Sequence, residues 1–339
     1  MTNANKIRGF SEDGIDRRLS VAPMMDWTDR HCRVFHRLIA PDALLFTEMV
    51  TADAIIHAGA ARFCSHDEIE HPLALQLGGS DPDKLARACE AVASFEFDEI
   101  NLNVGCPSDR VQSGRFGACL MAEPKLVADC MISMGNATDK LVSVKCRTGI
   151  DDMDEEAGLD DFIDAVADRG VRHFYLHARK AWLSGLSPKE NREIPPLNYE
   201  RVLRLKARRP DLYIYLNGGI VTAEAACAHL GQFDGVMIGR AAYKSPLILD
   251  EIEQIYFERP PIDRLSVIKA MADYADNHLK EGGKLHNITR HMLGFYNGFA
   301  GARLWRRTLG EQCRDEQNPK LMIQAADMIE SQLQNRQAS

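Results

Sequence analysis

The chain lacks the cysteine patterns that hold metals or form disulfide frameworks. Its 339 residues include nine cysteines, but these form no CxxC pair and show no zinc-like spacing with histidine. Such patterns are the usual sequence marks of a structural zinc site or of a disulfide-rich secreted domain. We therefore predict reduced thiols and no bound metal.

Long hydrophobic runs are missing as well. The first twenty residues are polar and carry charges of both signs, unlike a signal peptide, and no later segment approaches the length needed to span a bilayer. With 45% hydrophobic residues the chain can nevertheless bury a large core. These features predict a soluble cytoplasmic protein with no membrane partner.

Basic residues are outnumbered by acidic ones, 41 to 49, which gives a net charge of −8. This balance argues against nonspecific attraction to nucleic acid, although it says nothing about local patches. The segment from Lys280 to Lys320 is such a patch, because its eight Lys or Arg and four Asp or Glu leave a surplus of four positive charges. Within it, Arg303 and Arg306 are three apart and would share one helix face, with Trp305 turned elsewhere. That face is either solvated or a contact for a phosphate backbone.

Eight short β-rich runs alternate with amphipathic helical stretches between Leu19 and about Phe257. Eight strand–helix units in this length predict a (β/α)8 TIM barrel of the α/β class. The alternative is a doubly wound open sheet, which requires a glycine-rich phosphate turn after the first strand, where this chain has Ala22-Pro23-Met24-Met25-Asp26. The predicted strands are residues 19–24, 44–48, 73–77, 99–103, 141–147, 173–178, 213–217 and 236–239.

The strand pattern stops near Arg259-Pro260-Pro261, after which the chain reads as helices alone. We predict a polar N-terminal extension (1–18), a catalytic barrel (19–257) and a small all-helical C-terminal domain (258–339). The extension supports no prediction of its own.

The segment Asn103-Val104-Gly105-Cys106-Pro107 places a thiol in a tight turn directly after a predicted strand. Gly and Pro fix the backbone there and prevent a helix from continuing. Most cysteines are small buried hydrophobes without chemistry, and Cys106 departs from that pattern. It is a candidate acid or nucleophile, with a purely structural turn as the rival interpretation.

Other polar residues fall at the carboxyl ends of the predicted strands, where TIM barrels carry their chemistry. In the strand 141–147, Lys145 shares the inward face with residues 143 and 147, so an anionic ligand or a nearby carboxylate must balance its charge. Asn217-Gly218-Gly219 follows the seventh strand and Gly239-Arg240 the eighth. Glycine turns that lead into helices predict a phosphate-binding cup at this position.

Taken in order, these motifs resemble the tRNA-dihydrouridine synthases, and most closely their A subfamily. The resemblance runs from about Leu19 to Arg307. It is carried by Ala22-Pro23-Met24, Gln76-Leu77-Gly78-Gly79, Asn101 to Pro107, Lys145-Cys146-Arg147, Leu176-His177-Ala178-Arg179, Asn217-Gly218-Gly219 and Gly239-Arg240.

The resemblance implies an FMN-bearing barrel and a helical domain that bind tRNA, with NADPH reducing FMN and uridines 20 and 20a of the D-loop as targets. It makes Cys106 the proton donor to C5 of uracil, while the hydride goes to C6. The implied cofactor-binding residues are Ala22, Pro23, Met24, Gln76, Lys145, Arg147, His177, Asn217, Gly218, Gly219, Gly239 and Arg240. The implied tRNA-binding residues are Asn103, Lys189, Arg192, Arg303 and Arg306.

Two rival functions stay open on the sequence alone. A flavin barrel acting on a free pyrimidine-like small molecule would share most motifs, but it does not account for the basic helical tail. A non-catalytic tRNA-binding protein on the same scaffold would bind no flavin and would not need Cys106. The absence of a Rossmann turn indicates that nicotinamide visits the site transiently.

Overall fold

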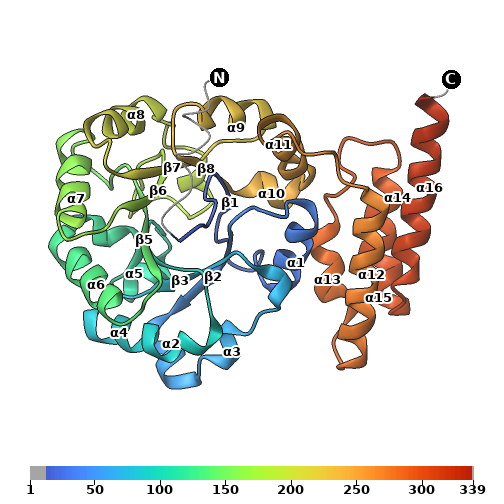
Figure 1. Ribbon diagram of the computed structural model, residues 1–339, viewed down its shortest axis with the longest axis horizontal. Helices are drawn as coiled ribbons and strands as arrows, with labels where there is room; N and C mark the ends of the chain where they lie inside the picture. The colour runs from blue at the N-terminus through green and yellow to red at the C-terminus, as the bar shows by residue number, and fades with distance from the viewer. Residues whose placement is uncertain (1–12, 338–339) are drawn as a thin grey trace. The chain divides into compact units, whose positions relative to one another are not determined.

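The eight predicted strands form one parallel sheet, in the order β1-β8-β7-β6-β5-β4-β3-β2, in a computed structural model that describes residues 13–337 (Figure 1). The ring closes through a parallel bridge between Ser20, in the first strand, and Leu44, directly before the second. The (β/α)8 barrel is therefore confirmed. The strands are β1 (Leu19–Val21), β2 (Leu45–Thr51), β3 (Leu73–Gly78), β4 (Glu99–Val104), β5 (Leu141–Arg147), β6 (His173–His177), β7 (Tyr213–Asn217) and β8 (Gly235–Ile238).

Helices alternate with these strands and continue beyond them. The short 3-10 or π turns are η2 (Glu68–Glu70), η3 (Ala93–Phe95), η4 (Gly117–Ala122), η5 (Glu190–Arg192) and η6 (Thr308–Gln312). The α-helices are α1 (Arg30–Ile39), α2 (Ala52–Ala58), α3 (Ala61–Cys64), α4 (Pro82–Ala91), α5 (Asp109–Ser113), α6 (Pro124–Asn136), α7 (Ala157–Ala167), α8 (Tyr199–Arg208), α9 (Ala223–Leu230), α10 (Arg240–Lys244), α11 (Leu247–Phe257), α12 (Arg264–Lys280), α13 (Leu285–Met292), α14 (Ala302–Arg307), α15 (Cys313–Glu316) and α16 (Lys320–Gln337).

Polar caps set where several helices begin. Asp81 accepts hydrogen bonds from the backbone amides of Asp83 and Lys84 at the start of α4, and Pro82 occupies the first helical position. Asn198 caps α8 in the same way through the amide of Arg201. Each cap satisfies amides that the helix itself leaves without a partner, which contributes about 1 kcal/mol.

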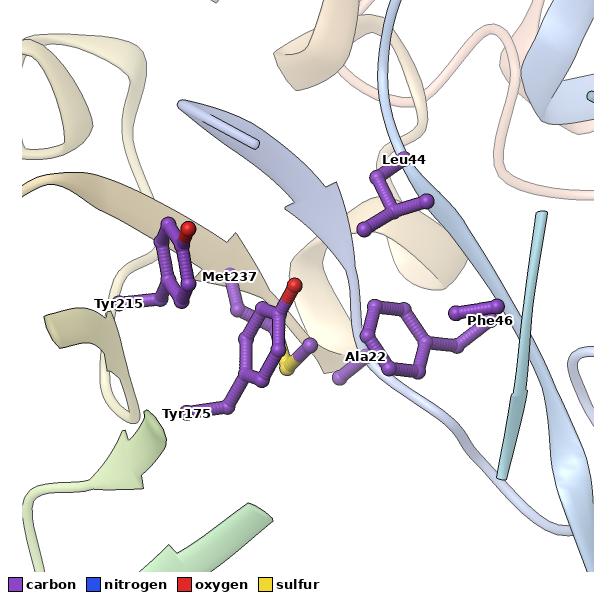
Figure 2. Close-up of a cluster of buried hydrophobic side chains, with 7 residues drawn as sticks. Ala22, Leu44, Phe46, Tyr175, Tyr215 and Met237 are labelled. Carbon is purple, nitrogen blue, oxygen red and sulfur yellow. The ribbon is translucent and has the colours of Figure 1, made fainter. Parts of the chain in front are cut away.

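Large side chains fill the inside of the barrel. Tyr175 stacks on Tyr215 with ring centroids 4.6 Å apart, and Phe46 meets Tyr175 edge-on at 5.1 Å. Figure 2 shows these rings with Met237 of β8 and with Ala22, which directly follows β1. Aromatic pairs of this kind contribute about 0.5–1.5 kcal/mol beyond the burial of their area. The barrel interior is therefore a packed core.

A buried ion pair lies within the same barrel. Arg17 and Glu99 are both fully buried, with 2.6 Å between Nε of the arginine and Oε2 of the glutamate. Asp13 accepts two further hydrogen bonds from the Arg17 guanidinium. The sequence supported no prediction for the N-terminal extension, and the structure shows that its residue Arg17 pairs with a carboxylate in the core.

The chain divides into two compact units. One comprises residues 13–25, 42–220 and 228–239 and holds all eight strands. The other comprises 26–41, 221–227 and 240–337 and consists of helices, so α1, α10 and α11 group with the C-terminal helices. A C-terminal helical region is thus present, and the boundary at 257/258 stays a prediction. Within residues 13–337, no helix combines the length and hydrophobicity needed to cross a membrane.

Candidate active site

Strand register brings several predicted site residues together at the carboxyl ends of the strands. Asn103 on β4 pairs with Lys145 on β5. His177 on β6 lies between its register partners, Arg147 on β5 and Asn217 on β7. Since all these strands are parallel, their carboxyl ends share one edge of the barrel, which is where such folds carry their sites.

The Cys106 turn is held by hydrogen bonds on both sides of the thiol. The side-chain oxygen of Asn103 accepts from the backbone amides of Gly105, at 3.1 Å, and Cys106, at 3.0 Å. The Cys106 carbonyl accepts from the amide of Ala118 at 2.9 Å. The thiol is half-buried, and its sulfur lies 3.5 Å from Oγ of Ser108. The backbone is thus fixed while the thiol keeps access to a ligand.

A glycine on the neighbouring turn allows this arrangement. Gly117 has a φ of +78°, and a Cβ there would lie 2.6 Å from the Cys106 carbonyl oxygen. Only glycine combines that conformation with so close an approach.

Lys145 is a half-buried cation that hydrogen-bonds to an uncharged partner. Its Nζ donates to Oδ1 of Asn217 at 3.1 Å, and among residues 13–337 no carboxylate accepts from it. Loss of water lowers the pKa of Lys145 to about 8, and the charge of Arg147 acts in the same direction. The charge is thus left for an electron-rich or anionic ligand.

The neighbouring His177 ring is neutral near pH 7. Burial lowers its pKa well below the usual value, and the charges of Arg147 and Lys145 lower it further. No hydrogen bond joins its ring to another residue of the described chain. His177 therefore offers a neutral imidazole to a ligand.

Arg147 serves as a brace between two loops. Its Nε donates to the Gly105 carbonyl at 2.8 Å, and its Nη1 donates to the carbonyls of Lys180 and Asn191, each at 3.0 Å. Burial lowers its pKa to about 10. These bonds fix the Cys106 turn against the loop after β6, while a direct contact with a cofactor stays a prediction.

The two glycine turns differ in the space around their backbones. Gly218 and Gly219 have φ values of +109° and +72°, and a Cβ on Gly218 would lie 2.4 Å from the His177 ring. At Gly239 a Cβ would meet nothing within 4 Å. Space for a ligand next to the backbone is thus seen at Gly239, and the phosphate cup stays a prediction.

The remaining predicted cofactor residues lie at three strand ends. Gln76, on β3, is buried and donates from Nε2 to Asn101 at 2.8 Å. Ala22 directly follows β1 and donates its amide to the Ile238 carbonyl, and Pro23 and Met24 after it are half-buried. Arg240 is the first residue of α10 and belongs to the helical unit.

The predicted tRNA contacts beyond Asn103 are exposed on each unit. Lys189 and Arg192 lie at η5 in the loop after β6, and Arg303 and Arg306 lie on α14. The buried Trp305 donates its indole N–H to the Met292 carbonyl, so it points away from the two arginines, as predicted.

Sequence reasoning missed the polar residues beneath the site. Ser143 donates to the carboxylate of Glu99 and accepts from the side chain of Asn101. The inward parity of Ser143 in its strand was visible in the sequence, but its partners were not. Within residues 13–337, no group of three or more His, Cys, Asp or Glu is arranged to hold a metal.

Comparison with known proteins identifies relatives of the whole chain. The family model described as dihydrouridine synthase matches residues 20–333. A protein of Xanthomonas campestris named tRNA-dihydrouridine(20/20a) synthase is 56% identical over 87% of this chain and 88% of its own. One of Pseudomonas syringae with the same name is 52% identical over 94% of this chain and 95% of its own.

Solved structures extend the likeness of the fold. An old yellow enzyme homologue from Zymomonas mobilis has a TM-score of 0.50 at 13% identity, covering 74% of this chain and 91% of its own. Morphinone reductase has a TM-score of 0.52 at 12% identity, covering 74% and 88%. Both show the barrel fold alone. The match of the family model along nearly the entire chain, together with relatives above half identity, shows that this chain belongs to the dihydrouridine synthase family of enzymes.

Proposed function

We propose that this chain reduces uridines 20 and 20a in the D-loop of tRNA to 5,6-dihydrouridine, with FMN as bound cofactor and NADPH as reductant. The observation that carries the proposal is the half-buried Cys106 thiol, held on a turn that Asn103 and Arg147 brace by hydrogen bonds. The names of the relatives support the choice of substrate.

FMN fits the residues present. Lys145 offers a positive charge with no carboxylate partner in the described part of the chain, which suits the electron-rich edge of a flavin. His177, Asn217 and Gln76 offer polar groups around it, and the open backbone at Gly239 leaves room for a phosphate. Bound FMN would supply the hydride that goes to C6 of the uracil ring.

Cys106 supplies the proton of the same reaction. The S–H bond breaks as a C–H bond forms at C5 of uracil, which leaves a thiolate that solvent later protonates. Arg147 donates from Nε to the carbonyl of Gly105, the residue before this cysteine, and so braces the turn that carries the thiol. The hydrogen bonds from the turn amides to Asn103 keep the backbone in place during the step.

The tRNA is held by basic side chains on exposed segments. Lys189 and Arg192 extend from the barrel unit, and Arg303 and Arg306 from the helical unit. The target base must leave its stack to reach a flavin in the barrel, at a cost of a few kcal/mol. Phosphate contacts offset that cost, and they do not depend on which base is presented.

The test begins with protein purified without added cofactor. We expect flavin absorbance and, after extraction, a mass equal to that of FMN. With NADPH and an unmodified tRNA transcript, mass spectrometry should find dihydrouridine at positions 20 and 20a. A transcript with cytidine at both positions is the matched control, and free uridine tests the small-molecule rival. Colourless protein, reduction of free uridine alone, or no product from any substrate would overturn the proposal.

A further inference from the structure

A continuous chain of buried side-chain hydrogen bonds leads from the core of the barrel to the Cys106 turn. Three of its members, Glu99, Asn101 and Asn103, alternate along β4 and so point to the same side of the strand. Gln76 on β3 and Ser143 on β5 connect them. Glu99, Asn101 and Ser143 are fully buried, Gln76 is 1% exposed and Asn103 is 9% exposed.

The bonds of this amide chain all run in one direction. The turn amides donate to Oδ1 of Asn103, whose Nδ2 donates to Oε1 of Gln76 at 2.8 Å. Nε2 of Gln76 donates to Oδ1 of Asn101 at 2.8 Å. Nδ2 of Asn101 donates to Oγ of Ser143 at 2.7 Å, and the Ser143 hydroxyl donates to Glu99.

The groups at both ends of the amide chain fix the direction of its hydrogen bonds. Glu99 is paired with Arg17, so its carboxylate is ionised and can only accept hydrogen bonds. Ser143 must therefore donate to it, which leaves the serine oxygen to accept from the NH2 group of Asn101. At the other end the backbone amides of Gly105 and Cys106 can only donate, which turns the carbonyl of Asn103 toward them. No amide in between can be reversed without placing two donors or two acceptors in contact.

We propose that Glu99, through Ser143 and Asn101, positions the amides of Gln76 and Asn103, so that both present N–H groups to the ligand while Asn103 holds the Cys106 turn. The inference rests on the proposed function for what the ligand is. An amide NH2 group has two hydrogens, and the chain uses one on each residue, so one N–H of Gln76 and one of Asn103 are left. These suit the carbonyl oxygens of a flavin or of a uracil.

Ser143 is the link that can be removed most cleanly. In Ser143→Ala the carboxylate of Glu99 keeps its ion pair with Arg17, but the NH2 group of Asn101 loses its acceptor. Glu99 then no longer determines the direction of the hydrogen bonds in the amide chain. Ser20→Ala is the matched control, because Ser20 is also a fully buried serine of a barrel strand. Its hydroxyl donates to the Val236 carbonyl, which is not part of the amide chain.

Two measurements separate positioning from stability. The first is the dissociation constant of FMN from the apoprotein, followed by quenching of flavin fluorescence. Since one hydrogen bond contributes about 0.5–1.5 kcal/mol, we expect Ser143→Ala to bind FMN about 2- to 10-fold more weakly, with Ser20→Ala unchanged. The second is the rate of uridine reduction by prereduced enzyme at saturating tRNA. Misplacement of reacting groups costs up to about 100-fold, so that rate should fall about 10- to 100-fold, with KM for tRNA within about twofold.

A second pair of variants covers the case in which Ser143→Ala fails to fold. Ser143→Thr and Ser143→Val add the same bulk to the strand, but only threonine keeps the hydroxyl. We expect Ser143→Thr to bind FMN and reduce uridine better than Ser143→Val. Equal FMN affinities in Ser143→Ala and Ser20→Ala, or in Ser143→Thr and Ser143→Val, would overturn the inference. If the parent protein binds FMN but forms no dihydrouridine, the proposed function fails, whereas the comparison of FMN affinities still tests the amide chain.

Discussion

The two glycine turns at the ends of β7 and β8 should respond to the same substitution in opposite ways. Gly218 has a φ of +109°, and a Cβ there would lie 2.4 Å from Cδ2 and 2.7 Å from Nε2 of His177. Gly239 has no such constraint, since a Cβ on it would meet nothing within 4 Å. Gly218→Ala and Gly239→Ala therefore form a matched pair that adds one methyl group to each turn.

The cost at Gly218 has two parts. A side chain in the left-handed region costs about 1–2 kcal/mol, and overpacking against the imidazole adds about 1–3 kcal/mol. If the His177 ring rotates away, only the backbone part is left, so the loss of stability should be at least about 1 kcal/mol. At Gly239 the alanine should leave the stability of the apoprotein unchanged or raise it by about 0.4–1 kcal/mol, because it restricts the unfolded chain.

Urea unfolding of the two apoproteins measures this difference directly. We expect a lower midpoint for Gly218→Ala and a parental or higher midpoint for Gly239→Ala, with equal slopes. FMN titration then adds a second comparison, because a methyl group in the open space at Gly239 should weaken FMN binding without loss of stability. Equal midpoints for the two variants would refute the reasoning about Gly218. Parental FMN affinity in Gly239→Ala would remove that turn from the phosphate cup.

Three further predictions concern the thiol, the lysine and the basic helix. Cys106→Ala should keep FMN and tRNA binding while the rate of dihydrouridine formation falls about 10²- to 10⁴-fold. The control Cys119→Ala, which removes another half-buried thiol, should stay near the parental rate. A Cys106→Ala enzyme with a rate within a few-fold of the parent would exclude Cys106 as the proton donor. The pKa of Lys145 is about 8 in the folded protein against 10.5 for an ordinary lysine, so the unfolded chain binds more protons between these values and apoprotein stability should rise across that pH range. Lys145→Met should remove part of this rise and should weaken FMN binding. A pH profile of stability unchanged by the substitution would contradict the assignment. Arg303→Ala/Arg306→Ala should weaken tRNA binding and lower the slope of log affinity against log salt by roughly 0.7–0.9 for each lost phosphate contact, with NADPH oxidation unchanged. A parental slope together with a reduced melting temperature would show that these arginines form a solvated helix face and do not contact tRNA.

The fold was largely readable from the sequence because hydrophobic periodicity is a local signal. The strands at 141–147 and 213–217 were predicted with the bounds that the structure gives, and the first strand, predicted to reach residue 24, ends at Val21. The Ala-Pro-Met segment after it continues the apolar pattern, although proline has no N–H for a sheet hydrogen bond.

The sequence predicted the site only for side chains whose direction follows from the alternation along a strand or from a position at a strand end. Lys145 was expected to point inward, and it reaches Asn217 two strands away. The sequence could not predict that Arg147 donates hydrogen bonds to backbone carbonyls of two loops, because loop paths follow from tertiary packing. The Arg17–Glu99 pair could not be predicted for the same reason, since 82 residues separate its members and no local pattern distinguishes Arg17 from the neighbouring Arg18.

The position of Arg17 has a consequence for how this chain can be shortened. A boundary drawn at Leu19, where the predicted barrel begins, would separate the buried carboxylate of Glu99 from its partner Arg17. The trimmed protein would keep every strand, the glycine turns after β7 and β8, and Cys106. It would nevertheless bury the charge of Glu99 without compensation, a change that typically costs about 3–5 kcal/mol, or else take up a proton there. A protonated Glu99 becomes a donor as well as an acceptor, so trimming the amino end would alter hydrogen bonding at the opposite end of the barrel, where the proposed site lies.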